Sequence, residues 1–172
     1  MQIRHEADMD SILLASRFAR IAALLALALL AAPVWAQATP PADSLPRVRV
    51  TLHGQRFDAQ VAATDSSRAY GLMNRTKLAP NQAMLFVFRH ASPRWFWMKD
   101  TKIPLDMLFF DAQRKLISMQ LDARPCTQQP CTIYPSYKPA MYVLEIAAGV
   151  AQRDDMRVGD EMRIEGAYGP VQ

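Results

Sequence analysis

The chain has 172 residues, with 20 Lys and Arg against 16 Asp and Glu, and 51% of its residues are hydrophobic. This length suits one domain, and the large hydrophobic share with only 21% charged residues excludes a disordered protein. Two cysteines are too few for a disulfide-rich scaffold or a four-thiolate zinc site. The net charge of +4 comes from scattered basic residues, which argues against nucleic acid as a partner.

Residues 1–36 have the pattern of a secretory signal peptide. Arg17 and Arg20 precede an apolar run, and Ala36 supplies a small residue at its exit. The run is shorter than the roughly 20 apolar residues that span a bilayer, although an uncleaved anchor is the alternative reading. We predict cleavage after Ala36 and a periplasmic or secreted protein, which meets the membrane only through the signal peptide before cleavage.

The rest of the chain reads as a leader, one domain and a tail. Residues 37–46 carry three prolines and predict an extended leader, whereas residues 47–166 form a single domain and residues 167–172 a C-terminal tail. Hydrophobic and polar residues alternate at 48–52 and again at 57–61, on either side of His53-Gly54. This alternation predicts a β-hairpin, and Thr64 is suited to cap a short helix over about 65–72.

Further short apolar runs follow in the second half of the chain. Strands are expected at 84–88, 94–99, 105–110, 115–121, 141–147 and 161–165, with a helical stretch at about 150–155. Many short strands with turns between them predict a mostly β fold, a compact antiparallel sandwich or barrel of about eight strands and two short helices. No repeated strand–long-helix pattern supports a parallel sheet.

Cys126 and Cys131 lie close together in a proline-rich loop between expected strands. In an oxidising compartment such a pair predicts a disulfide. A redox-active pair or two metal ligands are the alternatives, but four residues separate the cysteines, and only His53 and His90 remain as further ligands. We therefore expect a structural disulfide, no bound metal and no cofactor.

Two carboxylates interrupt otherwise apolar strands, Asp106 in one and Glu145 in another. A buried carboxylate is costly unless it is paired or hydrogen-bonded, and Arg75, Lys99 and Lys102 are the expected cationic partners. Trp95, Trp97 and Lys99 share one face of a strand by their alternate spacing. The predicted ligand-binding residues are Arg75, Trp95, Trp97, Lys99, Asp100, Asp106 and Glu145. A purely structural ion-pair network is an equally good reading of the same residues.

Three segments of the chain resemble the DUF192 family, also called UPF0127. They are residues 70–75 (YGLMNR), 83–88 (AMLFVF) and 96–107 (FWMKDTKIPLDM), and residues 142–149 and 158–160 fit the second half of the family. The resemblance covers about residues 48–165. The family usually has Asn where this chain has Asp100, and Gly where it has Ala83. The resemblance implies a small, mostly β domain that is often exported, and it implies no established activity.

These observations leave three hypotheses about function. The first is a non-enzymatic binding module for a cell-envelope ligand such as a saccharide or a peptide, held by an aromatic and charged site. The second is a hydrolase that uses Asp106 and Glu145 as a carboxylate pair for acid–base catalysis. The third is a structural or partner-binding envelope protein. The first hypothesis is favoured, because the sequence contains no recognisable catalytic motif.

Overall fold

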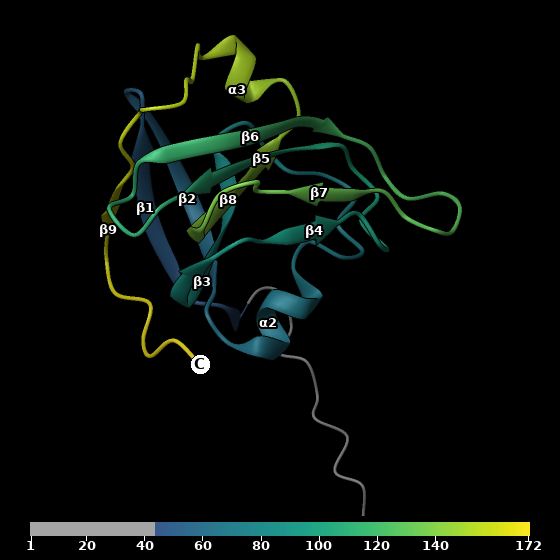
Figure 1. The fold of residues 1–172 in the computed structure, drawn as a ribbon, viewed down its shortest axis with the longest axis horizontal. Helices are drawn as coiled ribbons and strands as arrows, with labels where there is room; N and C mark the ends of the chain where they lie inside the picture. Colours follow the sequence, from purple (N-terminus) through teal and green to yellow (C-terminus); the bar gives the residue numbers. More distant parts are fainter. Residues whose placement is uncertain (1–43) are drawn as a thin grey trace, which may run out of the picture. The chain divides into compact units, whose positions relative to one another are not determined.

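The computed structural model describes residues 44–172, which form a seven-stranded sheet and a two-stranded sheet (Figure 1). The large sheet has the strand order β6-β5-β8-β3-β2-β1-β9, and the small sheet pairs β4 with β7. The elements are β1 (Arg47–Leu52), β2 (Gln55–Ala62), α2 (Asp65–Tyr70), β3 (Gln82–Ser92), β4 (Trp95–Trp97), β5 (Leu105–Phe110), β6 (Leu116–Ala123), β7 (Ile133–Pro135), β8 (Ala140–Ala147), α3 (Val150–Arg153) and β9 (Arg163–Glu165). The predicted mostly β, sandwich-like fold is confirmed, and the large sheet is not closed into a barrel.

The β1–β2 hairpin is the predicted one. Its strands pair antiparallel, with Val50 opposite Phe57, and His53 and Gly54 in the turn both have positive φ. Two consecutive residues with positive φ give the turn a twist that matches the twist of the strands. The local alternation of hydrophobic residues therefore determines this part of the fold.

The pairing of β2 with β3 is parallel, which the sequence did not predict. Parallel neighbours need a crossover connection, and here α2 and the loop that follows it supply that connection. The helix is only six residues long, so its pattern does not resemble the long helices that usually join parallel strands. The other pairings in the large sheet are antiparallel.

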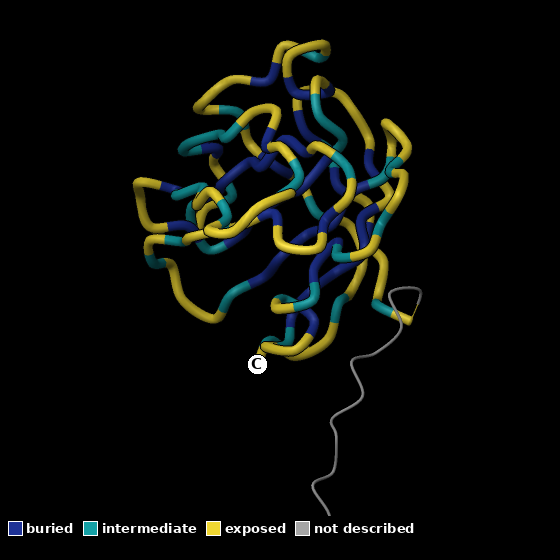
Figure 2. Tube along the Cα trace, turned by 90° about the vertical axis from the view of Figure 1, so that its right-hand side faces the viewer, coloured by how far each residue is buried: buried dark blue, intermediate teal, exposed yellow. Residues whose placement is uncertain are grey.

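The central strands are buried on both faces. All six residues of β5 are buried, and its apolar residues are divided between two hydrophobic clusters on opposite faces of the sheet. Leu108 and Phe110 belong to the cluster that also contains Val150 of α3, and Met107 and Phe109 belong to the cluster that the β4–β7 sheet and the region after α2 cover. Figure 2 shows the buried residues gathered inside the domain and the exposed ones along the loops.

Helix α2 has well-defined ends. The Thr64 side chain accepts a hydrogen bond from the Ser67 backbone amide, and the Ser67 hydroxyl accepts one from the Thr64 amide, so the two residues form a capping box. The helix ends two residues earlier than predicted, at Tyr70. Gly71 follows with a φ of 50°, and a Cβ atom at this position would lie 3.2 Å from the Phe86 ring. Both the backbone conformation and the close ring favour glycine here.

Strand β7 was not predicted. It is a three-residue strand in a proline-rich segment, and it forms because Phe96 of β4 pairs with Tyr134. Side chains of β6 connect it to the large sheet: Ser118 donates a hydrogen bond to the Ser136 carbonyl at 2.6 Å, and Gln120 donates one to the Pro135 carbonyl at 2.9 Å. The small sheet is thereby fixed against one face of the large one.

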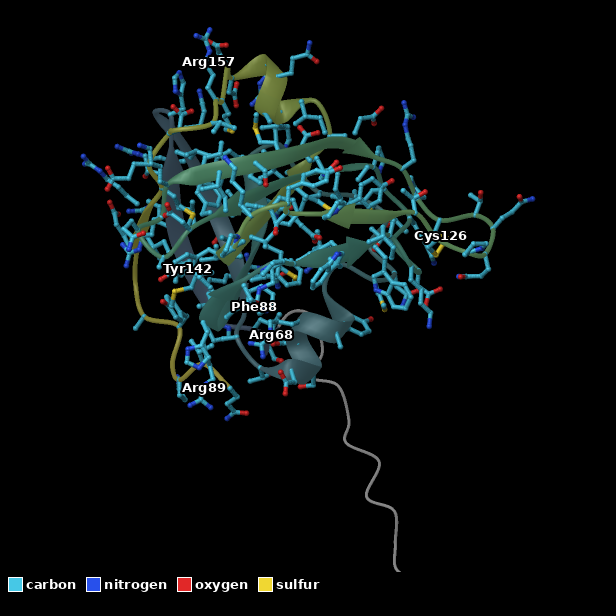
Figure 3. All side chains as sticks on the ribbon, viewed as in Figure 1. Arg68, Phe88, Arg89, Cys126, Tyr142 and Arg157 are labelled. Atoms are coloured by element: carbon cyan, nitrogen blue, oxygen red, sulfur yellow. A yellow bond between two sulfur atoms is a disulfide. The ribbon has the colours of Figure 1, made fainter. Side chains whose placement is uncertain are left out.

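The predicted disulfide between Cys126 and Cys131 is present, with Cα atoms 5.4 Å apart. It closes the loop between β6 and β7, which projects from the domain in Figure 3. The predicted tail, residues 167–172, packs on the domain: Tyr168 and Val171 contact the first hydrophobic cluster, and the Gln172 amide donates to the Ala63 carbonyl at 3.0 Å.

The predicted signal peptide, residues 1–36, lies outside the described residues, as does most of the predicted leader. Within residues 44–172, no helix is long and apolar enough to cross a membrane.

Asp106 is a structural residue of the large sheet. It is 1% exposed, and its carboxylate accepts hydrogen bonds from the Asp122 amide at 2.9 Å and from the Ala151 amide at 3.1 Å. The first bond connects β5 to the end of β6, and the second holds the first turn of α3. Backbone amides therefore compensate the buried carboxylate, in place of the cations that the sequence suggested.

We expect Asp106→Asn to destabilise the domain by about 1–3 kcal/mol, because an amide side chain has only one acceptor oxygen and leaves one buried amide unpaired. Chemical denaturation of the wild type and the variant measures this loss. Asp122→Asn, at an exposed position, is the control and should change the free energy of unfolding by less than about 0.5 kcal/mol. Equal stability of Asp106→Asn and the wild type would contradict the assigned role.

Candidate functional site

The two carboxylates that the sequence suggested as a catalytic pair lie on opposite faces of the large sheet. In the β5–β8 pairing, Met107 is opposite Glu145 and Asp106 is opposite Ile146. Directly opposed residues share a face, and successive residues alternate between faces. Asp106 therefore faces the cluster with Ile146, and Glu145 faces the other one. The carboxylate pair of the hydrolase hypothesis is not formed.

Glu145 lies in an apolar environment without a partner. It is 4% exposed, and its directly opposed neighbours on β3 and β5 are Met84 and Met107, both fully buried. Within residues 44–172, no hydrogen bond or ion pair to its carboxyl group is formed. No described side-chain oxygen is both fully buried and unpaired, so the Glu145 carboxyl oxygens are not sealed inside the core.

Burial raises the pKa of Glu145 from its ordinary value of 4.5 to about 8. Removal from water disfavours the charged form, and no nearby positive charge compensates for it. The carboxyl group is therefore mainly protonated at neutral pH. In this state it offers one O–H donor as well as acceptor oxygens.

Glu145 lines a small cleft between the region of α2 and the β4–β7 sheet. The cleft has a volume of about 40 Å³, enough for about three water molecules. Its walls come from the end of α2 and the residues that follow, from β3 and β4, and from the turn after β4. The lining residues are Arg68, Ala69, Tyr70, Gly71, Leu72, Met73, Phe86, Phe96, Trp97, Lys99, Thr101 and Glu145.

Aromatic side chains and one lysine surround this cleft. The Phe86 and Phe96 rings pack edge to face, with centroids 5.1 Å apart. Trp97 is 48% exposed, and the Lys99 ammonium group lies 5.4 Å from the centre of its ring. This distance is within the range of a cation–π contact, so Trp97 holds the Lys99 side chain beside the cleft.

Two loops that contribute to the cleft are connected by a backbone hydrogen bond. The Asn74 amide donates to the Asp100 carbonyl at 2.8 Å. Asp100 has a φ of 56°, in the left-handed region that Asn and Asp adopt more readily than other non-glycine residues. This conformation explains why either Asp or Asn suits the position. Asp100 thus shapes the wall of the cleft through its backbone, while its exposed side chain does not line it.

The structure brings together three of the seven predicted ligand-binding residues. The residues that line the cleft are Trp97, Lys99 and Glu145. The other four, Arg75, Trp95, Asp100 and Asp106, do not. Arg75 donates a hydrogen bond to the Gln60 side chain instead, and Trp95 is 68% exposed outside the cleft. No described cation forms an ion pair with either Asp106 or Glu145, so the predicted ion-pair network is wrong.

Sequence reasoning missed Phe86, Phe96, Thr101 and the segment from residue 68 to residue 73 as parts of the site. Phe96 could have been found, because it lies between two exposed tryptophans and must point inward on the same strand. The segment after α2 carries no chemical anomaly. It reaches the cleft only through the parallel crossover, which the sequence did not predict.

We expect Glu145→Gln to flatten the pH dependence of stability. Between about pH 4.5 and pH 8 the folded protein keeps a proton on Glu145 that the unfolded chain has released. Stability therefore falls as pH rises through this window, by at most about 1.4 kcal/mol per pH unit, and the neutral amide removes this contribution. Denaturation of both proteins at pH 5, 6.5 and 8 measures the difference. Parallel stability curves would contradict the placement of Glu145.

A family model matches residues 48–164 of the chain. The matching family is DUF192, which is described as "Uncharacterized ACR, COG1430". No curated protein sequence matches the chain significantly.

Solved structures show the same fold. One, from Sinorhizobium meliloti 1021, is named as a proposed transcription regulator; it is 35% identical with a TM-score of 0.65, and the match covers 70% of this chain and 95% of that one. Another, from Novosphingobium aromaticivorans DSM 12444, is a protein of unknown function; it is 33% identical with a TM-score of 0.67 and coverages of 73% and 91%. The family model matches 117 residues, which run along the chain from β1 to β9. The chain therefore belongs to the DUF192 family.

Proposed function

We propose that the protein is a non-enzymatic binding module whose ligand enters the cleft between Trp97 and Glu145. The observation that carries this proposal is the buried Glu145 carboxyl group, which no described residue satisfies and which faces the cleft. A ligand group that hydrogen-bonds to Glu145 would complete the site. Such a bond forms to a carboxyl group that burial keeps protonated, in surroundings of low polarity where a hydrogen bond is stronger than at the surface.

The chemistry of the walls restricts the ligand. The cleft admits only a small group, whereas Trp97 and Lys99 beside it offer a flat apolar surface and a positive charge. The ligand therefore presents a small hydrogen-bonding group to Glu145 and a flat face to Trp97. Saccharides of the cell envelope have both features, since their rings carry apolar faces edged with hydroxyl and amide groups. This agrees with the exported location that the N-terminal sequence suggests.

A binding role fits the cleft better than catalysis. Acid–base hydrolysis of a glycosidic bond uses two carboxyl groups that face one another across the scissile bond. Glu145 is the one carboxyl group among the described lining residues. The basic side chains in the wall of the cleft, Arg68 and Lys99, could orient a ligand. Arg68 is already occupied by the Ala63 and Val87 carbonyls at 2.7 and 2.9 Å, so Lys99 is the cation available to a ligand.

We expect Trp97→Ala to weaken ligand binding at least tenfold and to leave the domain folded. The ring is half exposed, so its loss removes a contact surface without opening the core. Thermal shifts of the protein against cell-wall muropeptides, chito-oligosaccharides, neutral oligosaccharides and short peptides identify the ligand. At 100 times its dissociation constant, a ligand stabilises the protein by about 2.7 kcal/mol. Calorimetry then compares the affinities of the variants.

Trp95→Ala is the matched control, because Trp95 lies on the same strand and face but does not line the cleft. Its affinity should stay within about twofold of the wild type. Equal losses from both substitutions would move the site away from the cleft, and an affinity unchanged by Trp97→Ala would refute it. A panel without any stabilising compound would favour the alternative of a structural or partner-binding envelope protein.

A further inference from the structure

A second polar surface lies on β1, β2 and β9, away from the cleft. Along these strands one set of side chains packs into the first hydrophobic cluster, and the alternate set points outward. The outward set, which we call the arginine face, consists of Arg47, Arg49, Thr51, Arg56, Asp58, Arg163 and Glu165. Its six charged side chains are all exposed.

The arginine face contains a hollow that is larger than the cleft. The hollow has a volume of about 590 Å³, compared with about 40 Å³ for the cleft. Three arginines, two carboxylates and one amide line it, namely Arg47, Arg49, Arg56, Asp58, Glu165 and Asn81. The volume of the hollow lies within the range of about 300–1,000 Å³ that small-molecule sites have.

The charges on this face are only partly neutralised. Arg47 pairs with Asp58 at 2.7 Å and Arg49 pairs with Glu165 at 3.4 Å, and each of these side chains is more than 40% exposed. Exposed pairs of this kind contribute little to stability, so a ligand can replace them at little cost. Within residues 44–172, Arg56 and Arg163 form no ion pair or hydrogen bond through their side chains. The four arginines exceed the two acids by two charges.

We propose that the arginine face binds an acidic polysaccharide chain. Guanidinium groups bind carboxylates through two parallel hydrogen bonds, so Arg56 and Arg163 supply sites for uronic-acid groups. Asp58, Glu165 and Asn81 supply acceptors for sugar hydroxyls. The mixture of positive and negative groups suits a ligand whose charges are sparse and separated by hydroxyls.

The same mixture disfavours duplex DNA. A duplex carries one negative charge per about 1.7 Å of its axis, and two exposed carboxylates in the hollow would face this dense charge. Sequence-specific readout of a duplex would also need an element that enters one of its grooves, whereas the face is a short, three-stranded surface with a hollow. Acidic saccharide is therefore the occupant that both the charge pattern and the hollow favour.

The test uses oligogalacturonate as the probe and calorimetry at low salt as the measurement. The double variant Arg56→Gln/Arg163→Gln removes the two unpaired arginines and leaves both ion pairs in place, so folding should be retained. It should bind the oligomer at least tenfold more weakly than the wild type. The matched control Arg89→Gln/Lys138→Gln removes the same charge from exposed positions outside the face, and its affinity should stay within about twofold.

Four outcomes would overturn the proposal. They are equal losses in the two double variants, equal binding of a neutral galactose oligomer, tighter binding of duplex DNA than of oligogalacturonate, and no binding of oligogalacturonate by the wild type. Trp97 does not line the hollow, so Trp97→Ala should leave oligogalacturonate binding unchanged. A failure of the proposal for the arginine face therefore leaves the proposal for the cleft intact.

Discussion

Burial of the three central strands on both faces is the constraint from which the rest of the structure follows. Strands β8 and β5 and residues 83–87 of β3 consist almost entirely of apolar residues, so neither of their faces can be left to water. One face is closed by the curvature of the sheet and by α3. The other face needs a separate cover, which the β4–β7 sheet and the segment after α2 provide. Two small covering elements meet above one sheet, and the cleft lies where they meet.

The same constraint explains why the two carboxylates differ in role. Each occupies one of the two buried faces. Asp106 lies where β6 and α3 bring free backbone amides within reach, and these amides satisfy it completely. Glu145 lies under the junction of the covering elements, where its nearest cross-strand neighbours are methionines. A carboxylate that accepts hydrogen bonds from backbone amides stabilises the fold, whereas burial without such partners raises the pKa of Glu145 and favours its protonated form.

Local patterns predicted the parts of this molecule that depend on local sequence. The β1–β2 hairpin, the limits of β5 and the Thr64 cap follow from alternation and capping chemistry. Trp97, Lys99 and Glu145 were predictable because each is chemically unusual at its position. Strand β7 was missed because three residues in a proline-rich segment form a strand only when a partner strand is beside them.

The pairing of Asp106 with Glu145 was predicted wrongly for a different physical reason. The spacing of two residues along one strand fixes their relative faces, but the faces of residues on different strands depend on register. A shift of one residue between β5 and β8 would have placed Asp106 opposite Glu145 and reversed the conclusion. Register here is set by the apolar neighbours: Leu108 must face Leu144, and Phe109 must face Val143.

At one side of the large sheet, β1, β9 and the first half of β2 have an outer face that no other described element covers. Beyond the reach of the covering elements, these segments keep one face in the core and leave the other in water. Alternation then requires polar residues on the outer face, but it does not require arginine. Lysine, threonine or glutamate would satisfy the fold equally well, because exposed positions contribute little to stability. Folding therefore does not explain why three arginines line the hollow with Arg163 on the same face, and recognition of an anionic ligand is the explanation that their chemistry supports.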